Sequence, residues 1–221
     1  RVEPSSWWVG MKDPRLQLLV HGTKVAVLEP TIDYAGVAIT GVERVANPNY
    51  LFVNLTVAPD TLPGTVRIDF RSKGRTIATR NFPLGAREPG SAERKGFGPE
   101  DVIYLVMPDR FANGDASNDT MKGLRDGLAR SEPFGRHGGD LQGIINHLDY
   151  VAGMGFTQLW LNPVLENAQS SITYHGYAIT DFYKVDPRLG TNEGYRLLSA
   201  EARKRGIGLI KDVVLNHCGS E

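Results

Sequence analysis

Short runs rich in β-branched and aromatic residues, separated by Asn, Gly, Pro and Asp, occupy the first 87 residues of the chain. Val66, Ile68 and Phe70 alternate with charged residues, which is the pattern of a strand with one face in water. The runs that predict strands are Leu16–Val20, Lys24–Leu28, Val37–Ile39, Tyr50–Val57 and Gly64–Phe70. Their spacing predicts a small immunoglobulin-like β-sandwich over residues 1–87.

A polar segment follows the last of these runs. Residues 88–100 are rich in Gly, Pro and charged residues and show no hydrophobic periodicity. Such a composition is typical of a connection between domains. We therefore predict a linker over residues 88–100 and a second domain over residues 101–221.

After the linker the pattern changes to alternating strand-like and helix-like segments. Val102–Met107 is almost continuously apolar, which is expected of a strand buried on both faces of a parallel sheet. Apolar residues then recur at helical spacing from Ile144 to Ala152, after Asp140, which can cap that helix. The later predicted elements are a strand over Phe156–Leu161, a helix over Glu193–Arg205 and a strand over Ile207–Leu215. This order is typical of a parallel α/β fold.

Two parallel architectures fit the alternation. An open doubly wound sheet usually carries a Gly-rich phosphate-binding turn after its first strand, and the segment Met107–Ala112 lacks one. A (β/α)8 barrel needs eight strands and about 250 residues, whereas only three strands are predicted over residues 101–221. We therefore predict a multidomain fold, β plus α/β, in which the sandwich is followed by the first three strands of a truncated (β/α)8 TIM barrel.

Composition and charge narrow the classes of molecule that the chain is expected to bind. The chain of 221 residues carries 25 Lys and Arg and 25 Asp and Glu, so its charge favours neither nucleic acid nor an anionic membrane. Val102–Met107, the longest uninterrupted apolar run, falls far short of the ~20 residues that span a bilayer. The single cysteine, Cys218, excludes an internal disulfide framework. The start, which lacks an initiator Met, fits either a trimmed mature protein or a segment cut out for expression. We expect a periplasmic location, with the cytoplasm as the alternative.

Oxygen-bearing side chains gather in the loop after the first strand of the second domain. Asn113, Asp115, Asn118 and Asp119 lie close together in the sequence, and Asp140 adds a carboxylate further on. Calcium takes six to eight oxygen ligands in a flexible geometry, which suits such a set. The EF-hand pattern is not met, and an ordinary Asn/Gly/Asp turn cluster is the alternative.

Aromatic and polar side chains also follow the second and third predicted strands, where a barrel keeps its chemistry. In the loop Tyr174–Tyr177, a tyrosine ring can stack on a sugar and an imidazole can bond hydroxyls, or the loop can simply pack on its scaffold. At the end of the last run, Asp212 either holds neighbouring groups or contacts a substrate. His217 either binds a ligand or caps backbone there.

Other sequence signatures do not identify a site. The sequence contains no Gly-x-Ser-x-Gly elbow, no His-Glu-x-x-His, no Cys-x-x-Cys and no P-loop. Cys218 follows His217, but adjacent residues of an extended strand point to opposite faces, which argues against a Cys–His dyad. Trp7 and Trp8 are either a sugar-binding platform or, as is commoner for adjacent tryptophans near a strand, part of the core.

Five motifs occur in an order that resembles the alpha-amylase family of glycoside hydrolases. They are Met107–Asp115, His137–Gly143, Leu159–Val164, Tyr174–Tyr177 with Asp181–Tyr183, and Asp212–His217. The start of the chain, Trp7–Met11 and Leu16–Val20, is similar to the N-terminal β-sandwich module of bacterial cyclomaltodextrinases. The resemblance runs along nearly the whole chain and indicates the N-terminal part of a protein of the cyclomaltodextrinase and neopullulanase branch.

The resemblance implies a calcium ion (Ca2+) and a sugar-binding site. The implied calcium ligands are Asn113, Asp115, Asn118, Asp119, Asp140 and the carbonyl group of Gly138. Tyr177 corresponds to the ring that stacks on the sugar at the cleavage subsite, and His175 lies beside it. His217 corresponds to the histidine that bonds sugar hydroxyls there, and Asp212 matches the family's strand-end aspartate.

The implied activity is retaining hydrolysis of α-1,4-glucosidic bonds in cyclodextrins or maltooligosaccharides. That reaction needs two carboxyl groups about 5–5.5 Å apart. No position of this chain matches the family's nucleophile or acid/base, so we expect no catalytic residue here and an inactive isolated chain. The alternatives are a transglycosylase of the same family and a non-catalytic carbohydrate-binding protein. The sandwich either binds glucan, braces the barrel or makes a homodimer of the full-length protein.

Overall fold

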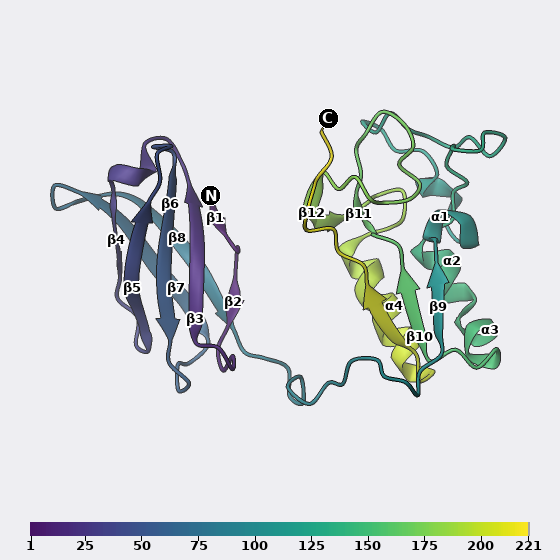
Figure 1. Cartoon of the computed structure of the whole chain (residues 1–221), viewed down its shortest axis with the longest axis horizontal. Helices are drawn as coiled ribbons and strands as arrows, with labels where there is room; N and C mark the ends of the chain where they lie inside the picture. The colour runs from purple at the N-terminus through teal and green to yellow at the C-terminus, as the bar shows by residue number, and fades with distance from the viewer. Residues whose placement is uncertain (221) are drawn as a thin grey trace. The chain divides into compact units, whose positions relative to one another are not determined.

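The computed structural model describes residues 1–220, which fold into two compact units (Figure 1). The first unit covers Arg1–Arg94 and the second begins at Lys95. Residues 86–102 contain neither helix nor strand. The boundary between the units therefore lies within the segment that the sequence marks as a linker.

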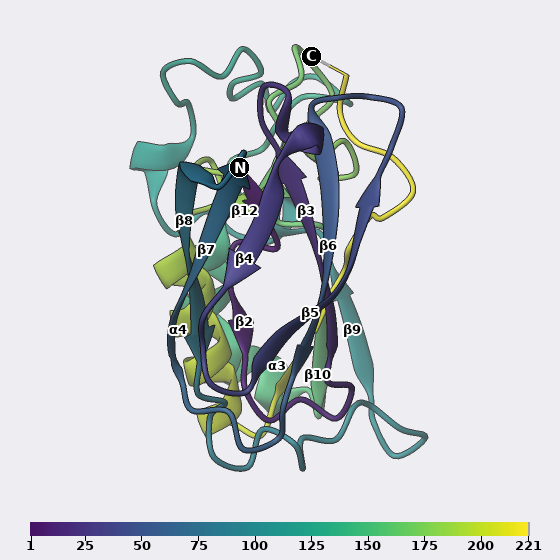
Figure 2. The same cartoon turned by 90° about the vertical axis from the view of Figure 1, so that its left-hand side faces the viewer.

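The first unit is a sandwich of two four-stranded sheets, which Figure 2 shows from the side. One sheet has the order β1 (Val2–Glu3), β3 (Arg15–His21), β6 (Tyr50–Val57) and β5 (Val37–Arg44). The other has the order β2 (Trp7–Trp8), β8 (Arg75–Gly85), β7 (Gly64–Ser72) and β4 (Glu29–Ile32). All pairings are antiparallel except that of β2 with β8.

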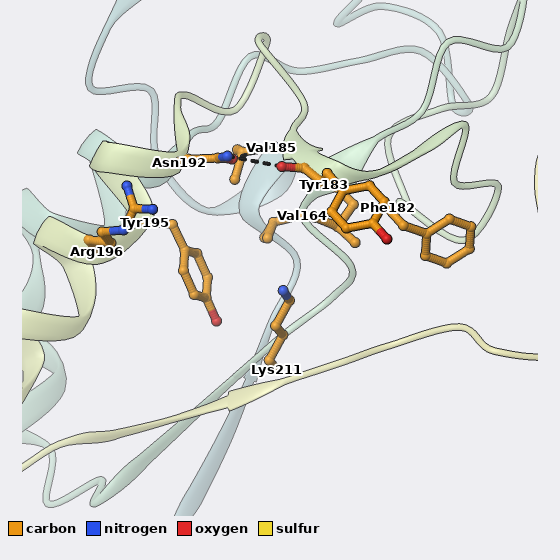
Figure 3. A pocket seen from close by; sticks show the side chains of 9 residues that line it. Val164, Phe182, Tyr183, Val185, Asn192, Tyr195, Arg196 and Lys211 are labelled. Carbon is orange, nitrogen blue, oxygen red and sulfur yellow. Dashed lines mark hydrogen bonds between the residues drawn. The ribbon is translucent and has the colours of Figure 1, made fainter. Parts of the chain in front are cut away.

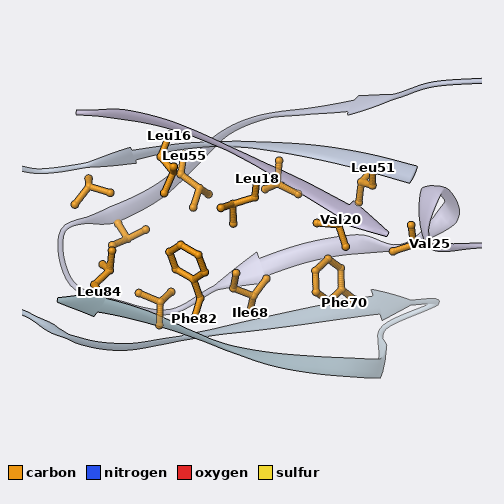
Figure 4. Packing of buried hydrophobic residues seen from close by; sticks show 14 residues of the cluster. Leu16, Leu18, Val20, Val25, Leu51, Leu55, Ile68, Phe70, Phe82 and Leu84 are labelled. Carbon is orange, nitrogen blue, oxygen red and sulfur yellow. The ribbon is translucent and has the colours of Figure 1, made fainter. Parts of the chain in front are cut away.

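Alternate side chains of the two sheets meet in a single core (Figure 4). Leu18 and Leu51 come from one sheet, and Ile68 and Phe82 from the other; all are almost fully buried. Each such side chain contributes about 1.5–3 kcal/mol through burial. The predicted alternation of Val66, Ile68 and Phe70 is confirmed, because all three point into this core.

One strand prediction in this unit is wrong, and one long strand was not predicted. The run Lys24–Leu28 is not a strand: Val25–Val27 form a short 3-10 helix (η1) after Lys24, whose φ of 52° turns the chain. The apolar residues Val25 and Ala26 are nonetheless buried. The run is therefore apolar because its side chains are buried, and not because its backbone pairs in a sheet. The sequence also did not predict β8, in which Arg75, Thr76 and Ile77 are all exposed and the alternation is lost.

The second unit is built on three parallel strands in the order β13 (Gly208–Lys211), β10 (Gln158–Leu161) and β9 (Ile103–Val106). Its helices are α1 (Pro108–Phe111), α2 (Leu141–Asn146), α3 (Leu148–Gly153) and α4 (Asn192–Lys204), with a 3-10 turn η2 (Ala116–Asn118). A small hairpin pairs β11 (Leu165–Glu166) with β12 (Asp181–Val185). The α/β alternation of the partial barrel is thus confirmed.

One face of this sheet is packed and the other is exposed. Leu159 and Leu161 are buried against Ile144 of α2 and Leu198 of α4. The prediction that the first strand is buried on both faces is wrong, because the side chain of Leu105 is 56% exposed.

The predicted helix after Asp140 is two short helices. The amide of His147 bonds the carbonyl oxygen of Ile144 at 3.0 Å, a tighter turn than an α-helix makes. Its ring nitrogen Nδ1 donates to the carbonyl oxygen of Gly143 at 2.7 Å, which draws that carbonyl out of the helical pattern. The chain therefore bends at His147, between α2 and α3.

The last predicted strand, Ile207–Leu215, ends too late. In the structure β13 pairs with β10 only as far as Lys211, opposite Leu161. Pro163 then ends any extension of β10, because proline has no amide to donate. Asp212 is consequently the first residue after the strand.

The longest helix, α4, has 13 residues. Within residues 1–220, no helix is long and apolar enough to cross a membrane.

Candidate functional site

The loop that follows β10 and the segment that follows β13 meet at the carboxyl ends of the strands. The hydroxyl group of Tyr177 donates to Oδ2 of Asp212 at 2.7 Å. The indole nitrogen of Trp160 donates to the same oxygen at 3.2 Å. Asp212 therefore ties a strand residue and a loop residue together in a group that is partly open to solvent.

The two histidines predicted from the sequence border Tyr177. Nε2 of His217 donates to the carbonyl oxygen of Tyr177 at 2.8 Å, and Nδ1 of His217 accepts from the side-chain amide of Asn216 at 2.7 Å. The backbone amide of Tyr177 donates to Nδ1 of His175 at 2.9 Å. The rings of His175 and Tyr177 are stacked, with centroids 5.9 Å apart. The structure thus brings together all four predicted substrate-binding residues.

The local environment sets the protonation of this cluster. Burial, together with the hydrogen bond to Asp212, raises the pKa of Tyr177 to about 12, so its hydroxyl stays a donor. Burial lowers the pKa of His175, which keeps the imidazole neutral and leaves Nδ1 free to accept a hydrogen bond. The 37% exposure of Tyr177 leaves part of its ring available to a ligand.

The loop that carries Tyr177 is shaped by its backbone. Gly176 has φ of 81°, and a Cβ atom at this position would collide with the carbonyl oxygen of Pro163. Only glycine fits there, because the position is both left-handed and crowded. Ile172, five residues before Tyr177, also has a positive φ of 57°, a costly conformation for a β-branched residue.

Buried polar groups hold the start of this loop. The amide and the hydroxyl group of Thr173 both donate to Oδ2 of Asp126, at 2.9 and 2.8 Å. Nη1 of Arg136 donates to the hydroxyl oxygen of Thr173 at 3.1 Å. Arg136 and the Asp186–Arg188 ion pair beside it are almost completely buried. Burial and the neighbouring Arg188 lower the pKa of Arg136.

Sequence reasoning missed Trp160, Asp126 and Arg136. Trp160 lies in one of the motifs quoted for the family resemblance, so its place beside a strand end was a usable signal. Asp126 and Arg136 carried no signal, because they lie in an irregular segment far from Thr173 in the sequence. Their roles depend on tertiary contacts.

The residues predicted to bind calcium form a second cluster, between η2 and the start of α2. Asp140 accepts hydrogen bonds from the amides of Gly114 and Asp115, at 3.1 and 2.8 Å, and from the side-chain amide of Asn118 at 3.2 Å. It also caps α2 through the amide of Gly143. The side-chain amide of Asn113 donates to Asp119 at 2.6 Å.

The donor set fits a hard cation. Oδ1 of Asn118 is buried and has no hydrogen-bond partner, which is costly unless the oxygen has a ligand. Gly138, with φ of 83°, packs its backbone so closely on Asp119 that a Cβ atom would collide with the carboxylate. Within residues 1–220 no three His, Cys, Asp or Glu side chains are grouped to hold a metal. The fit therefore depends on amide and carbonyl oxygens, which calcium accepts.

A separate pocket of about 180 Å3 lies beside α4 (Figure 3). Its lining includes Tyr195 and Arg196 of α4, Phe182 and Tyr183 of β12, and Lys211 at the end of β13. The ammonium group of Lys211 lies 5.8 Å from the ring centre of Tyr195, a cation–π contact. None of the residues predicted as site residues lines this pocket.

Comparisons with known proteins cover both units. The profile described as "Alpha amylase, catalytic domain" matches residues 105–221, more than half of the chain. The profile described as "Cyclomaltodextrinase, N-terminal" matches residues 1–88.

Individual relatives match about half of the chain. Neopullulanase 2 of Thermoactinomyces vulgaris is 40% identical over 125 residues, which is 55% of this chain. The periplasmic alpha-amylase of Escherichia coli is 38% identical over 130 residues, 53% of this chain. The solved gamma-CGTase of alkalophilic Bacillus clarkii is 34% identical over 54% of this chain, with a TM-score of 0.50. The chain spans 20%, 19% and 19% of the lengths of these relatives.

Proposed function

Since the chain belongs to the alpha-amylase family, we propose that it is the N-terminal portion of a retaining glycoside hydrolase. The proposed substrates are cyclodextrins and maltooligosaccharides, cleaved at α-1,4-glucosidic bonds. The observation that carries the proposal is the cluster of Tyr177, Asp212 and His217 at the carboxyl ends of the parallel strands. That is where the barrel fold places its active site.

The geometry supports a sugar-binding wall. The Tyr177 ring is partly exposed and its hydroxyl is fixed by Asp212, so the ring is oriented before a sugar arrives. A pyranose ring presents C–H groups that can pack on such an aromatic face. Preorientation of this kind lowers the entropy cost of binding.

Polar contacts to the sugar would come from His217, whose exposed imidazole would exchange its hydrogen bond with the Asn216 side chain for one with a sugar hydroxyl. In a retaining reaction, bonds to sugar hydroxyls that strengthen as the oxocarbenium-like state forms accelerate the chemistry. The carboxyl nucleophile and the acid/base would come from residues outside positions 1–221. We accordingly expect the isolated chain to bind sugar without turnover.

The test is a kinetic comparison in the complete protein. Tyr177→Ala and His217→Ala should each lower kcat/KM for β-cyclodextrin and maltoheptaose by about 10²-fold, because each removes a contact at the cleavage subsite. Tyr150→Ala is the matched control, since Tyr150 is an exposed tyrosine on α3. Saturable binding by the complete protein without any product would contradict the proposal and favour a non-catalytic carbohydrate-binding protein.

Transglycosylation is the second candidate. It is supported by the similarity to a gamma-CGTase. The two reactions share the covalent intermediate and differ in whether water or a sugar hydroxyl attacks it. Product analysis separates them: new, longer or cyclic glucans indicate transfer, and only shorter linear ones indicate hydrolysis.

We further propose a calcium ion at the Asn118 cluster, held by the oxygens of Asn113, Asp115, Asn118, Asp119 and Asp140 and by the carbonyl group of Gly138. The ion would supply a fixed positive charge that joins the loop after β9 to the start of α2. Its role there is structural. It lies outside the cluster around Tyr177, and no chemical step depends on it.

We also propose a location and an assembly for the complete protein. The periplasm is supported by the similarity to a periplasmic alpha-amylase. A homodimer of the complete protein stays a prediction. Fractionation of cells that express the complete protein, followed by light scattering of the purified product, tests both.

A further inference from the structure

The turn that presents His175 and Tyr177 begins at a buried threonine. The amide of Gly176 donates to the carbonyl oxygen of Thr173 at 3.1 Å, so residues 173–176 form a hydrogen-bonded turn. The backbone amide of Tyr177 then donates to Nδ1 of His175 next to this turn. The orientation of both rings therefore depends on where Thr173 is held.

The residue before this threonine has a backbone conformation that needs support. Ile172 has a φ of 57°, which is costly for a β-branched residue. Its side chain is 47% exposed, so burial of that side chain offsets little of the cost. Such a conformation persists only where the surrounding contacts enforce it. Thr173 is 1% exposed and supplies contacts of this kind.

The hydroxyl group of Thr173 both donates and accepts a hydrogen bond. It donates to Oδ2 of Asp126 at 2.8 Å and accepts from Nη1 of Arg136 at 3.1 Å. The Thr173 amide donates to the same carboxylate oxygen at 2.9 Å. A hydroxyl group can make both side-chain bonds at once, whereas a methyl group in its place can make neither.

Both partners of this hydroxyl group are fixed by buried charges. Nη1 of Arg188 donates to the carbonyl oxygen of Asp126 at 2.6 Å, and Arg188 is paired with the buried Asp186. Arg136 is 2% exposed, and its Nε lies 3.7 Å from Oδ1 of the buried Asp109. Supporting groups that are locked in this way give a turn a defined position before any ligand binds.

Further contacts hold the turn beyond its first residue. The side-chain amide of Asn162 donates to the carbonyl oxygen of His175 at 3.3 Å. The guanidinium group of Arg110 lies 4.3 Å from the ring centre of Tyr174, a cation–π contact. Loss of the threonine hydroxyl group should therefore loosen the turn without unfolding it.

We propose that Thr173, held by Asp126 and Arg136, is a positioning residue that keeps the turn at residues 173–176 ready for a sugar. These three residues are called the Thr173 clamp below. The inference rests on the proposed function, because it takes Tyr177 as a contact of the substrate. A turn that is ordered in advance loses less conformational freedom on binding. The benefit is shared by the bound ground state and the transition state, so it belongs to KM rather than to kcat.

The first test measures the order of the turn without any sugar. Hydrogen exchange at the amides of residues 172–177 is followed by mass spectrometry in the complete protein. Thr173→Val keeps the size of the side chain and removes both hydroxyl bonds, so exchange in this segment should become about tenfold faster. Thr173→Ser keeps the hydroxyl group and should restore slow exchange.

Thr157→Val is the matched control. The Thr157 hydroxyl group also donates to an aspartate, Asp101, at 2.7 Å, and it also accepts from a backbone amide, that of Val102. It lies at the opposite end of β10, so this change should leave exchange at residues 172–177 unaltered. Asp126→Ala removes the half-buried partner and should reproduce the effect of Thr173→Val, which excludes a packing defect at residue 173 as the cause.

The second test measures the consequence for a sugar. In the complete protein, Thr173→Val should raise KM for maltoheptaose about tenfold and change kcat by less than about twofold, the pattern of lost uniform binding. Thr173→Ser should restore the KM. A general loss of folding would instead lower the active fraction, and with it kcat, at an unchanged KM.

The clamp and the proposed function fail in different ways. Unchanged exchange in Thr173→Val would overturn the clamp whatever the kinetics show. An unchanged KM would also overturn it, provided that Tyr177→Ala does lower kcat/KM. If exchange becomes faster and neither Thr173→Val nor Tyr177→Ala alters the kinetics, the proposed function is overturned, and with it the role of the turn in sugar binding.

Discussion

At the scale of single residues, the carboxylate of Asp212 organises the candidate site. It accepts from Tyr177 and from Trp160, so one side chain fixes both a loop aromatic ring and a strand aromatic ring. Whether Asp212 holds neighbours or contacts substrate was open in the sequence. The geometry shows the holding role directly.

Removing this carboxylate should change the titration of Tyr177. The pKa of Tyr177 is about 12 because of burial first and the bond to Asp212 second. Asp212→Ala should therefore lower that pKa, with burial keeping it above the usual value of 10.0. The measurement is ultraviolet titration of phenolate, taken as the difference from a Tyr177→Phe chain. Asp149→Ala, which removes a carboxylate elsewhere in the same unit, should leave the titration unchanged.

Residue positions were predictable where chemistry follows sequence motifs. Tyr177, His175, His217 and Asp212 were all named before their contacts were known, and they meet in space. Arg136 was not, because a buried arginine that bonds Thr173 looks in sequence like any surface arginine.

At the scale of elements, Asp140 joins a helix start to a distant loop. It caps α2 and accepts from the amides of Gly114 and Asp115. The cap was predicted from the sequence. The loop contacts were not, since they depend on how the chain returns to α2 after η2.

Asp140→Ala should destabilise the second unit by about 3 kcal/mol, which combines a lost cap of about 1 kcal/mol with partly buried amides left without an acceptor. Thr191→Ala is the control, because Thr191 caps α4 through a single bond to Gly194. It should cost about 1 kcal/mol. Urea denaturation followed by circular dichroism measures both. Equal costs would show that the loop contacts of Asp140 add nothing.

Calcium should stabilise the same element. At a concentration about 100-fold above its Kd, calcium should add about 2.7 kcal/mol to the free energy of unfolding, and a chelator should remove this gain. Asn118→Ala should abolish the response, because it deletes the buried oxygen that has no partner. Asn81→Ala, a change in an exposed residue of β8, should keep it. Thermal unfolding with and without calcium is the measurement, and an unchanged transition would rule out the site.

At the scale of the whole molecule, the sheet of the second unit presents an apolar face to solvent. Ile103, Leu105 and Trp160 are 38%, 56% and 40% exposed on it. In the register of the sheet, Leu105 lies beside Trp160, so the apolar surface is continuous. Exposed patches of this kind promote association.

The 221-residue chain should accordingly bind a hydrophobic dye and self-associate as its concentration rises. Leu105→Lys should reduce both effects, since it places a charge in the middle of the patch. Leu62→Lys is the control, because Leu62 is 75% exposed but belongs to the sandwich. Light scattering across a dilution series measures the self-association. A monomer at every concentration, without dye binding, would contradict the prediction.

The sequence by itself determined the sandwich, the order of strands and helices in the second unit, the cap at Asp140 and the residues of the candidate site. These follow from periodicity and from local chemistry, which act within a few residues of chain. The family resemblance added the roles, because a motif keeps its residues in order even when their contacts are distant.

Only the tertiary structure decided where β13 ends, which tryptophan faces outward and which face of the sheet is open. Each depends on partners that are far away in sequence: β10 stops pairing after Leu161, and Gly85 makes room for Trp8. Where a strand ends and which side chains are exposed depend on residues that are neighbours in space. A one-dimensional pattern records the tendency of a residue to be buried, while the packed structure supplies or withholds the surface that buries it.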